Sequence, residues 1–125
     1  AVAGELMAMG CYEVSLGDTI GQGTPETIRD MLIAVLDRVP AGRLAGHYHD
    51  TGGRALDNIE MSLELGLRVF DAAVGGLGGC PYAPGAKGNV ATEKVHDRLT
   101  ALGLSTGLDR EVLGRAGDMA KAMRG

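Results

Sequence analysis

The sequence predicts an α/β fold in which three strands, each followed by a helix, form a parallel sheet. Short apolar runs rich in β-branched residues alternate with longer segments that carry apolar residues at helical spacing. The expected strands start near residues 11, 43 and 67, which leaves room for one helix after each strand. Because parallel strands need a crossover connection, this order indicates right-handed βαβ units.

The first unit follows a short expected helix over residues 3–9, and its strand is expected at residues 11–16. Thr24 is a good helix N-cap, and Pro25 suits the first helical position. Apolar residues then recur at i, i+3, i+4 and i+7, which predicts one buried stripe made of Ile28, Met31, Leu32 and Val35. Pro40 is expected to close this unit.

The second and third strands are expected at residues 42–47 and 67–74. The helix between them has three residues that are expected to face inward, namely Leu56, Ile59 and Leu63. Two further helices are expected at residues 91–102 and 109–123. One side of the last helix gathers apolar residues and is therefore expected to be buried: Val112, Leu113, Ala116, Met119, Ala120 and Met123.

The strand spacing suits both a TIM (β/α)8 barrel and a doubly wound sheet. Polar residues inside the expected strands favour the barrel, because a barrel interior beside an active site accommodates them: Glu13, Ser15, His47 and Asp71. The unusual polar clusters also follow the strands, at the catalytic face of either fold. The sequence thus predicts three strand–helix units of a TIM barrel plus a terminal helix.

Composition excludes several classes of function. The chain has 125 residues, 45% of them hydrophobic, and 21 glycines that punctuate a folded chain. The net charge is −4 with no basic run, so no nucleic-acid partner is expected. No apolar run approaches the ~20 residues of a membrane span. The two cysteines lack CxxC spacing, so neither a disulfide scaffold nor a zinc knuckle is indicated, and a reducing, cytoplasm-like compartment is expected.

His47 and His49 lie two residues apart at the end of the second strand. Since side chains alternate along a strand, both imidazoles are expected to project to one side, with Tyr48 on the other. Two imidazoles on one side make half of a divalent-metal site, to which Asp50 could add a carboxylate or an orienting hydrogen bond. The alternative is a pair of solvated histidines at the start of a loop.

A glycine-rich segment follows the third strand and ends at Cys80: Gly75, Gly76, Gly78 and Gly79. A thiol on an exposed loop is placed to react, and glycines let a substrate or a moving backbone approach closely. The alternative is a turn that happens to hold a cysteine. The segment fits neither a P-loop nor a dinucleotide-binding pattern. Cys11 begins an apolar strand and is expected to be a buried structural residue.

Three further polar residues leave alternatives open. Asp18 ends the first strand, where it could assist a metal or a proton transfer or simply form a turn. Asn89 could cap the following helix, or its amide oxygen could complete a cation site. His96 is expected on a solvated helix face.

Three segments in order closely resemble hydroxymethylglutaryl-CoA lyase: EVSLGDTIGQGTP at 13–25, HYHDT at 47–51 and GLGGCPYA at 76–83. The resemblance continues through GAKGNVATE at 85–93. The HxHD element is shared with a wider superfamily that includes isopropylmalate and homocitrate synthases. The glycine segment ending in CPYA is much more specific to the lyase branch.

The resemblance implies a (β/α)8 barrel that cleaves 3-hydroxy-3-methylglutaryl-CoA to acetyl-CoA and acetoacetate with Mg²⁺ or Mn²⁺, as in leucine degradation and ketone-body formation. It implies metal ligation by His47, His49 and Asn89, and catalytic roles for Cys80, Asp18 and His47. Gly76, Gly78 and Gly79 would belong to the loop that closes over the substrate. It further implies an acyl-CoA substrate, a homodimer in the complete enzyme, and a cytoplasmic location, or the mitochondrial matrix in a eukaryote.

The sequence departs from the family pattern at two positions. Gly52 stands where the family more often has an aromatic residue, and Tyr48 replaces a smaller residue between the histidines. We therefore expect a divergent member of the family. The family's amino-terminal strands supply a metal-binding aspartate and its neighbouring arginine, which lie before the start of this chain. Residues 1–125 are accordingly expected to form a partial barrel domain, the carboxy-terminal part of the lyase.

Two alternatives to the lyase assignment follow from the same residues. One is a sibling metal-dependent lyase or synthase that acts on another acyl-CoA or oxo acid. The other is that the 125-residue chain by itself is an inert structural fragment, whose unpaired sheet edges would promote association.

Overall fold

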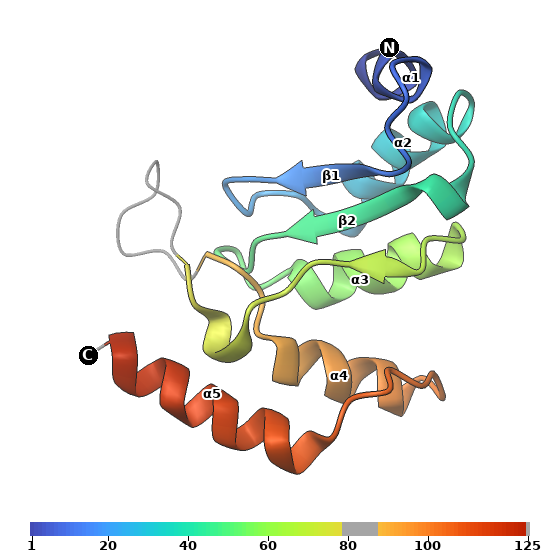
Figure 1. The fold of residues 1–125 in the computed structure, drawn as a ribbon. Helices are drawn as coiled ribbons and strands as arrows, with labels where there is room; N and C mark the ends of the chain where they lie inside the picture. The colour runs from blue at the N-terminus through green and yellow to red at the C-terminus, as the bar shows by residue number, and fades with distance from the viewer. Residues whose placement is uncertain (79–87, 125) are drawn as a thin grey trace.

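A parallel three-stranded sheet lies at the centre of the structure, a computed structural model that describes residues 1–78 and 88–124 (Figure 1). Its strands are β1 (Val14–Asp18), β2 (Leu44–Tyr48) and β3 (Val69–Phe70), hydrogen-bonded in sequence order. Val14 lies opposite Leu44, and the pairing runs to Asp18 opposite Tyr48. The expected parallel βαβ arrangement is confirmed.

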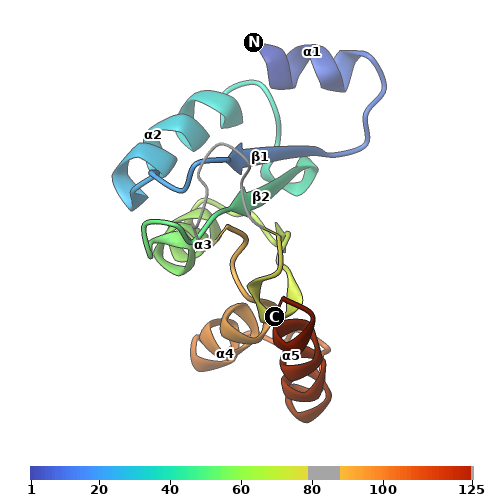
Figure 2. The same cartoon turned by 90° about the vertical axis from the view of Figure 1, so that its left-hand side faces the viewer.

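Five α-helices occur in the described residues: α1 (Val2–Ala8), α2 (Pro25–Leu36), α3 (Ala55–Glu64), α4 (Thr92–Ala101) and α5 (Arg110–Arg124). Two short 3₁₀ turns, η1 (Ala41–Arg43) and η2 (Val74–Gly76), precede β2 and follow β3. Figure 2 shows α2 and α3 on the same side of the sheet, with α4 and α5 side by side below them. Helices on one side only suit a barrel, because a doubly wound sheet carries them on both faces. None of the helices in the described segments is both long and apolar enough to cross a membrane.

Helix α2 begins as the sequence predicts. The side chain of Thr24 accepts a hydrogen bond from the Thr27 backbone N–H, and the Thr27 side chain accepts one from the Thr24 N–H, so the two residues form a capping box. Ile28 and Leu32 are buried against the sheet. Together these contacts fix the helix that covers β1.

The core lies between the sheet and helices α2 and α3. Tyr48 is only 2% exposed, and its hydroxyl lies 2.6 Å from the Ser62 Oγ of α3. The other buried residues of this cluster are Val14, Ile28, Leu32, Val39, Leu44, Ala55, Ile59, Leu67, Val90 and Val95. Tyr48 therefore identifies the helix-covered face of β2, and the residues on either side of it face the other way.

The strands are shorter than the sequence indicates. Strand β1 begins at Val14, and the preceding Cys11 is exposed, so the expectation of a buried structural cysteine is wrong. Here the backbone is still leaving α1, because the Cys11 N–H donates to the Leu6 carbonyl. Strand β3 ends at Phe70, after which the Ala73 N–H donates to the Val90 carbonyl instead of extending the sheet.

The apolar stripe expected on the last helix is wrong in part. Leu113 and Ala120 of α5 are buried, whereas Val112, Met119 and Met123 are exposed. The buried face also includes Gly117, because small residues let α5 approach the η2 turn closely. Close backbone contact, and not side-chain size, selects the face of this helix.

Candidate active site

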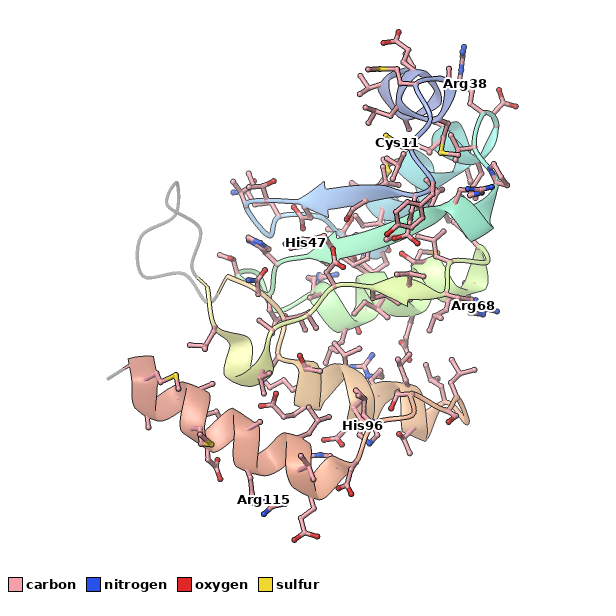
Figure 3. The ribbon with its side chains drawn as sticks, in the orientation of Figure 1. Cys11, Arg38, His47, Arg68, His96 and Arg115 are labelled. Carbon is pink, nitrogen blue, oxygen red and sulfur yellow. The ribbon has the colours of Figure 1, made fainter. Side chains whose placement is uncertain are left out.

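The two histidines project from the carboxyl end of β2, at the left of the sheet in Figure 3. Their ring centroids are 5.3 Å apart, and the rings are tilted by 48°. Tyr48, between them, points to the opposite face and reaches α3. The expectation that both imidazoles lie on one side of the strand is confirmed.

Asn89 is brought to the same end of β2. It forms an isolated antiparallel bridge with His49, and the neighbouring Asp50 N–H donates to the Gly88 carbonyl at 2.7 Å. The Asn89 Nδ2 donates to the Leu77 carbonyl at 3.0 Å, which turns Oδ1 away from that carbonyl. The N-cap of α4 is Ala91, without a side-chain hydrogen bond, so the helix-capping alternative for Asn89 is wrong.

The glycine segment lies against Asn89 as far as the structure describes it. The Gly78 carbonyl accepts a hydrogen bond from the Asn89 N–H at 3.2 Å. Gly78 has φ +95°, and a Cβ there would lie 2.7 Å from Asn89 Nδ2. Gly76 is buried. Gly79 and Cys80 fall outside the described residues, so their expected roles stay predictions.

Asp71 contacts His47 from the segment after β3, a link that the sequence reasoning did not make. Its Oδ2 lies 3.2 Å from His47 Nδ1 and 3.2 Å from Ser15 Oγ. Ser15 and Asp71 stand out in the sequence as polar residues inside expected strands. The period-2 alternation could have placed both on the face of His47, because parallel pairing aligns that face across the three strands.

Asp18 lies at the end of β1, but its carboxylate is held on the helix-covered face. Its Oδ2 accepts a hydrogen bond from the Gly23 N–H at 2.9 Å, and Asp18 pairs in register with Tyr48. Burial is the main cause of a raised Tyr48 pKa; the Ser62 hydrogen bond opposes it, and the Asp18 charge adds to it. Asp18 is therefore near the phenol and on the face opposite to His47, and its catalytic role stays a prediction.

Asp50 serves the loop between β2 and α3. It is buried, and its Oδ1 accepts a hydrogen bond from the Ala55 N–H at the start of α3. His96 lies away from this end of the sheet, with Nδ1 2.7 Å from Thr106 Oγ1 in the α4–α5 connection. It thus has a hydrogen-bond partner instead of a wholly solvated position.

Glu93 of α4 is a buried carboxylate that sequence reasoning missed. It is 8% exposed, and its two oxygens lie 2.9 and 3.1 Å from the Gly75 N of η2. A cavity of about 420 Å³ opens beside it, lined among others by Asp50, Asn89 and Arg110. Its position at the first turn of α4 was the available signal, since a carboxylate is favoured there.

The described residues suit a cation site made partly of an amide. Within residues 1–78 and 88–124, no three His, Cys, Asp or Glu side chains group to hold a metal ion. His49 Nδ1 is buried without a hydrogen-bond partner, which is costly unless something binds it. Two imidazoles and the Asn89 amide oxygen are a donor set that accepts Mg²⁺ or Mn²⁺.

Relatives of known name match nearly the whole chain. It is 56% identical over 117 residues to the mitochondrial hydroxymethylglutaryl-CoA lyase of Rattus norvegicus, covering 94% of this chain and 36% of that protein. It is 56% identical over 124 residues to the 3-hydroxy-3-isohexenylglutaryl-CoA/hydroxymethylglutaryl-CoA lyase of Pseudomonas aeruginosa, covering 99% of this chain and 41% of that protein. The chain thus spans well under half of each relative.

A solved structure gives the fold its context. The HMG-CoA lyase from Brucella melitensis superposes with a TM-score of 0.96 at 64% identity, over 98% of this chain and 44% of that one. Such structural neighbours are TIM barrels, so the prediction of strand–helix units from a TIM barrel is confirmed. The HMGL-like family model matches residues 1–120. The chain belongs to the HMGL-like family.

Proposed function

We propose that the polypeptide carrying this chain cleaves 3-hydroxy-3-methylglutaryl-CoA to acetyl-CoA and acetoacetate with the help of Mg²⁺ or Mn²⁺. The observation that carries the proposal is the meeting of His47, His49 and Asn89 at the carboxyl end of β2. Active sites of TIM barrels lie at this end of the strands. The names of relatives at 56% identity supply the substrate.

His47, His49 and Asn89 would hold the cation. The unpartnered, buried Nδ1 of His49 and the anchored amide of Asn89 both support this fit. A bound divalent cation polarises the substrate oxygens on which negative charge develops during the cleavage. The neighbouring glycines let the backbone at Gly78 approach Asn89 closely.

The reaction requires two proton transfers. A proton leaves the C3 hydroxyl as the bond between C2 and C3 breaks, which releases acetoacetate, and the carbanion of acetyl-CoA then takes up a proton. His47, Asp18 and Cys80 are the proposed groups that hold or move these protons. Gly76, Gly78 and Gly79 would form part of the loop that carries Cys80 and excludes water.

Replacement of the two cysteines tests the proposal. In the full natural polypeptide that contains these residues, Cys80→Ala is expected to lower kcat by about 10²–10⁴-fold, the range for a lost proton-transfer group. Cys11→Ala is the matched control, because Cys11 is exposed and precedes the amino end of β1. Acetoacetate formation measures turnover. Near-normal turnover of Cys80→Ala would contradict the assigned role.

A second substrate is favoured by one observation. The Pseudomonas aeruginosa relative is named for a 3-hydroxy-3-isohexenylglutaryl-CoA as well, so a larger group at C3 is a candidate. Comparing kcat/KM for the two thioesters distinguishes these candidates, and a ratio near one would indicate a dual enzyme. The polypeptide is further proposed to act as a homodimer, in the cytoplasm of a bacterium or the mitochondrial matrix of a eukaryote.

A further inference from the structure

Asp71 collects two hydrogen bonds on one carboxylate oxygen. Its Oδ2 accepts from Ser15 Oγ on β1 and lies 3.2 Å from His47 Nδ1 on β2. The Asp71 backbone is itself fixed, because its N–H donates to the Gly46 carbonyl at 2.9 Å. Three successive strand segments therefore meet at one oxygen atom.

The sheet register explains how Asp71 reaches across β2. Ala45 pairs with Ser15 on one side and with Val69 on the other, so a methyl group separates the outer strands at this level. Asp71 lies two residues beyond Val69, level with His47, and reaches Ser15 above that methyl group. A larger side chain at residue 45 would fill this space.

The contact fixes the proton on the imidazole. A carboxylate oxygen only accepts hydrogen bonds, so the proton of neutral His47 lies on Nδ1 and the lone pair on Nε2. A metal ion needs that lone pair, and carboxylates commonly orient metal-bound histidines in this way. The side chains of His47 and Asp71 are 40% and 51% exposed, so the pair adds little stability of its own.

We propose that Asp71 is a positioning residue that holds His47 in the tautomer and ring orientation needed to bind the divalent cation, and that Ser15 holds Asp71. This inference rests on the proposed function only in taking His47 as a metal ligand. It assigns a role to two residues that touch neither the cation nor the substrate. Asp71 therefore acts through His47.

Titration of the full natural polypeptide with Mn²⁺ tests the inference. Asp71→Asn keeps the shape of the side chain and is expected to raise the Kd for Mn²⁺ by about 10–100-fold. Ser15→Ala is expected to raise it less. Asp30→Asn is the matched control, because Asp30 is a 78% exposed carboxylate on α2 and its replacement removes the same charge.

The ¹⁵N signals of the His47 ring give a second readout that requires no metal. The wild type is expected to show protonated Nδ1, and Asp71→Asn a mixture of tautomers. Unchanged Mn²⁺ affinity and an unchanged tautomer in Asp71→Asn would overturn the inference, whatever the enzyme's activity. Should Asp71→Asn fail to fold, Ser15→Ala alone decides by the same two measurements. A wild type that binds Mn²⁺ through Asp71-dependent His47 but cleaves no hydroxymethylglutaryl-CoA would refute the proposed function and keep this inference.

Discussion

Tyr48, which stands between the two histidines, belongs to a buried chain of hydrogen bonds on the other face of β2. Its hydroxyl contacts Ser62 Oγ, which donates to the Asn58 carbonyl at 2.8 Å. The Asn58 Nδ2 donates to the Gly23 carbonyl at 3.0 Å, and the Gly23 N–H donates to Asp18. This chain ties the histidine strand to the loop that follows β1.

Replacing Tyr48 with Phe is expected to lower the free energy of unfolding by about 0.5–1.5 kcal/mol, the net value of one hydrogen bond. Because burial raises the pKa of Tyr48 above its ordinary 10.0, the folded state keeps its proton more tightly than the unfolded state. The stability from the neutral phenol is present below pH 10.0 and is lost as pH rises through the folded pKa. The difference between wild type and Tyr48→Phe should therefore shrink above pH 10, which urea denaturation at several pH values measures. A difference that grows there would contradict the buried phenol.

Gly78 is expected to be essential for the position of Asn89. In Gly78→Ala the new Cβ meets Asn89 Nδ2, so the proposed cation site should bind Mn²⁺ more weakly. Gly103→Ala is the matched control: Gly103 also has a positive φ, +83°, but a Cβ there meets nothing within 4 Å. Both variants should lose about 1–2 kcal/mol to backbone strain, and only Gly78→Ala should lose Mn²⁺ affinity. Equal Mn²⁺ affinities in the two variants would show that the contact with Asn89 is unimportant.

At the scale of elements, the described part of the glycine segment is held by two helices. Glu93 of α4 binds the Gly75 N of η2, and Gly117 of α5 lies against the Glu93 carboxylate. A Cβ at Gly75 would itself lie 3.0 Å from the Gly117 carbonyl. Two glycines and one buried carboxylate thus bring η2, α4 and α5 together.

Two glycines of α5 are expected to respond in opposite ways to alanine. A Cβ in Gly117→Ala would clash with Glu93 Oε2 and displace the buried carboxylate from Gly75, which should cost about 1–3 kcal/mol. In Gly114→Ala the new Cβ meets only the flexible Arg110 side chain, so the higher helix propensity of alanine should add up to about 1 kcal/mol. Thermal unfolding of the two variants gives the signs. Stabilisation by both would mean that Glu93 rearranges at no cost.

The sequence predicts the elements better where side chains decide than where backbones touch. The stripe of Ile28 and Leu32 and the cap at Thr24 are local patterns, and the structure confirms them. The buried face of α5 depends on the close approach of Gly117 to a turn far away in the sequence, which apolar periodicity does not record. At the site, alternation predicted the common side of His47 and His49. The link from Asp71 needed the register of three strands.

At the scale of the whole molecule, the described sheet is open at both edges. Strands β1 and β3 each pair only with β2 in the described residues, and Val69 is 41% exposed. The length of the expected barrel, about 250 residues, made this openness foreseeable. Which face is left uncovered became clear only with the placement of α2 and α3 (Figure 2).

The 125-residue chain produced by itself is expected to self-associate, because open edges and an uncovered sheet face favour pairing with other copies. Val69→Lys should reduce this association by placing a charge on the sheet. Val112→Lys is the control, since Val112 is also exposed, at 51%, but lies on α5. Light scattering after size-exclusion chromatography gives the mass. A monomeric wild type at micromolar concentration would contradict the expectation.

The packing around Gly46 restricts how this sequence could have arisen. A Cβ at residue 46 would lie 2.9 Å from both the Tyr48 and the Phe70 rings. An ancestor with a larger residue at 46 therefore had to acquire glycine there before tyrosine could enter between the histidines, and a reversion must shrink Tyr48 first. Ser62 gains its hydrogen-bond partner only in the last of these steps. The three positions form one evolutionary unit in which the order of substitution, and not only the final set, decides which intermediates fold.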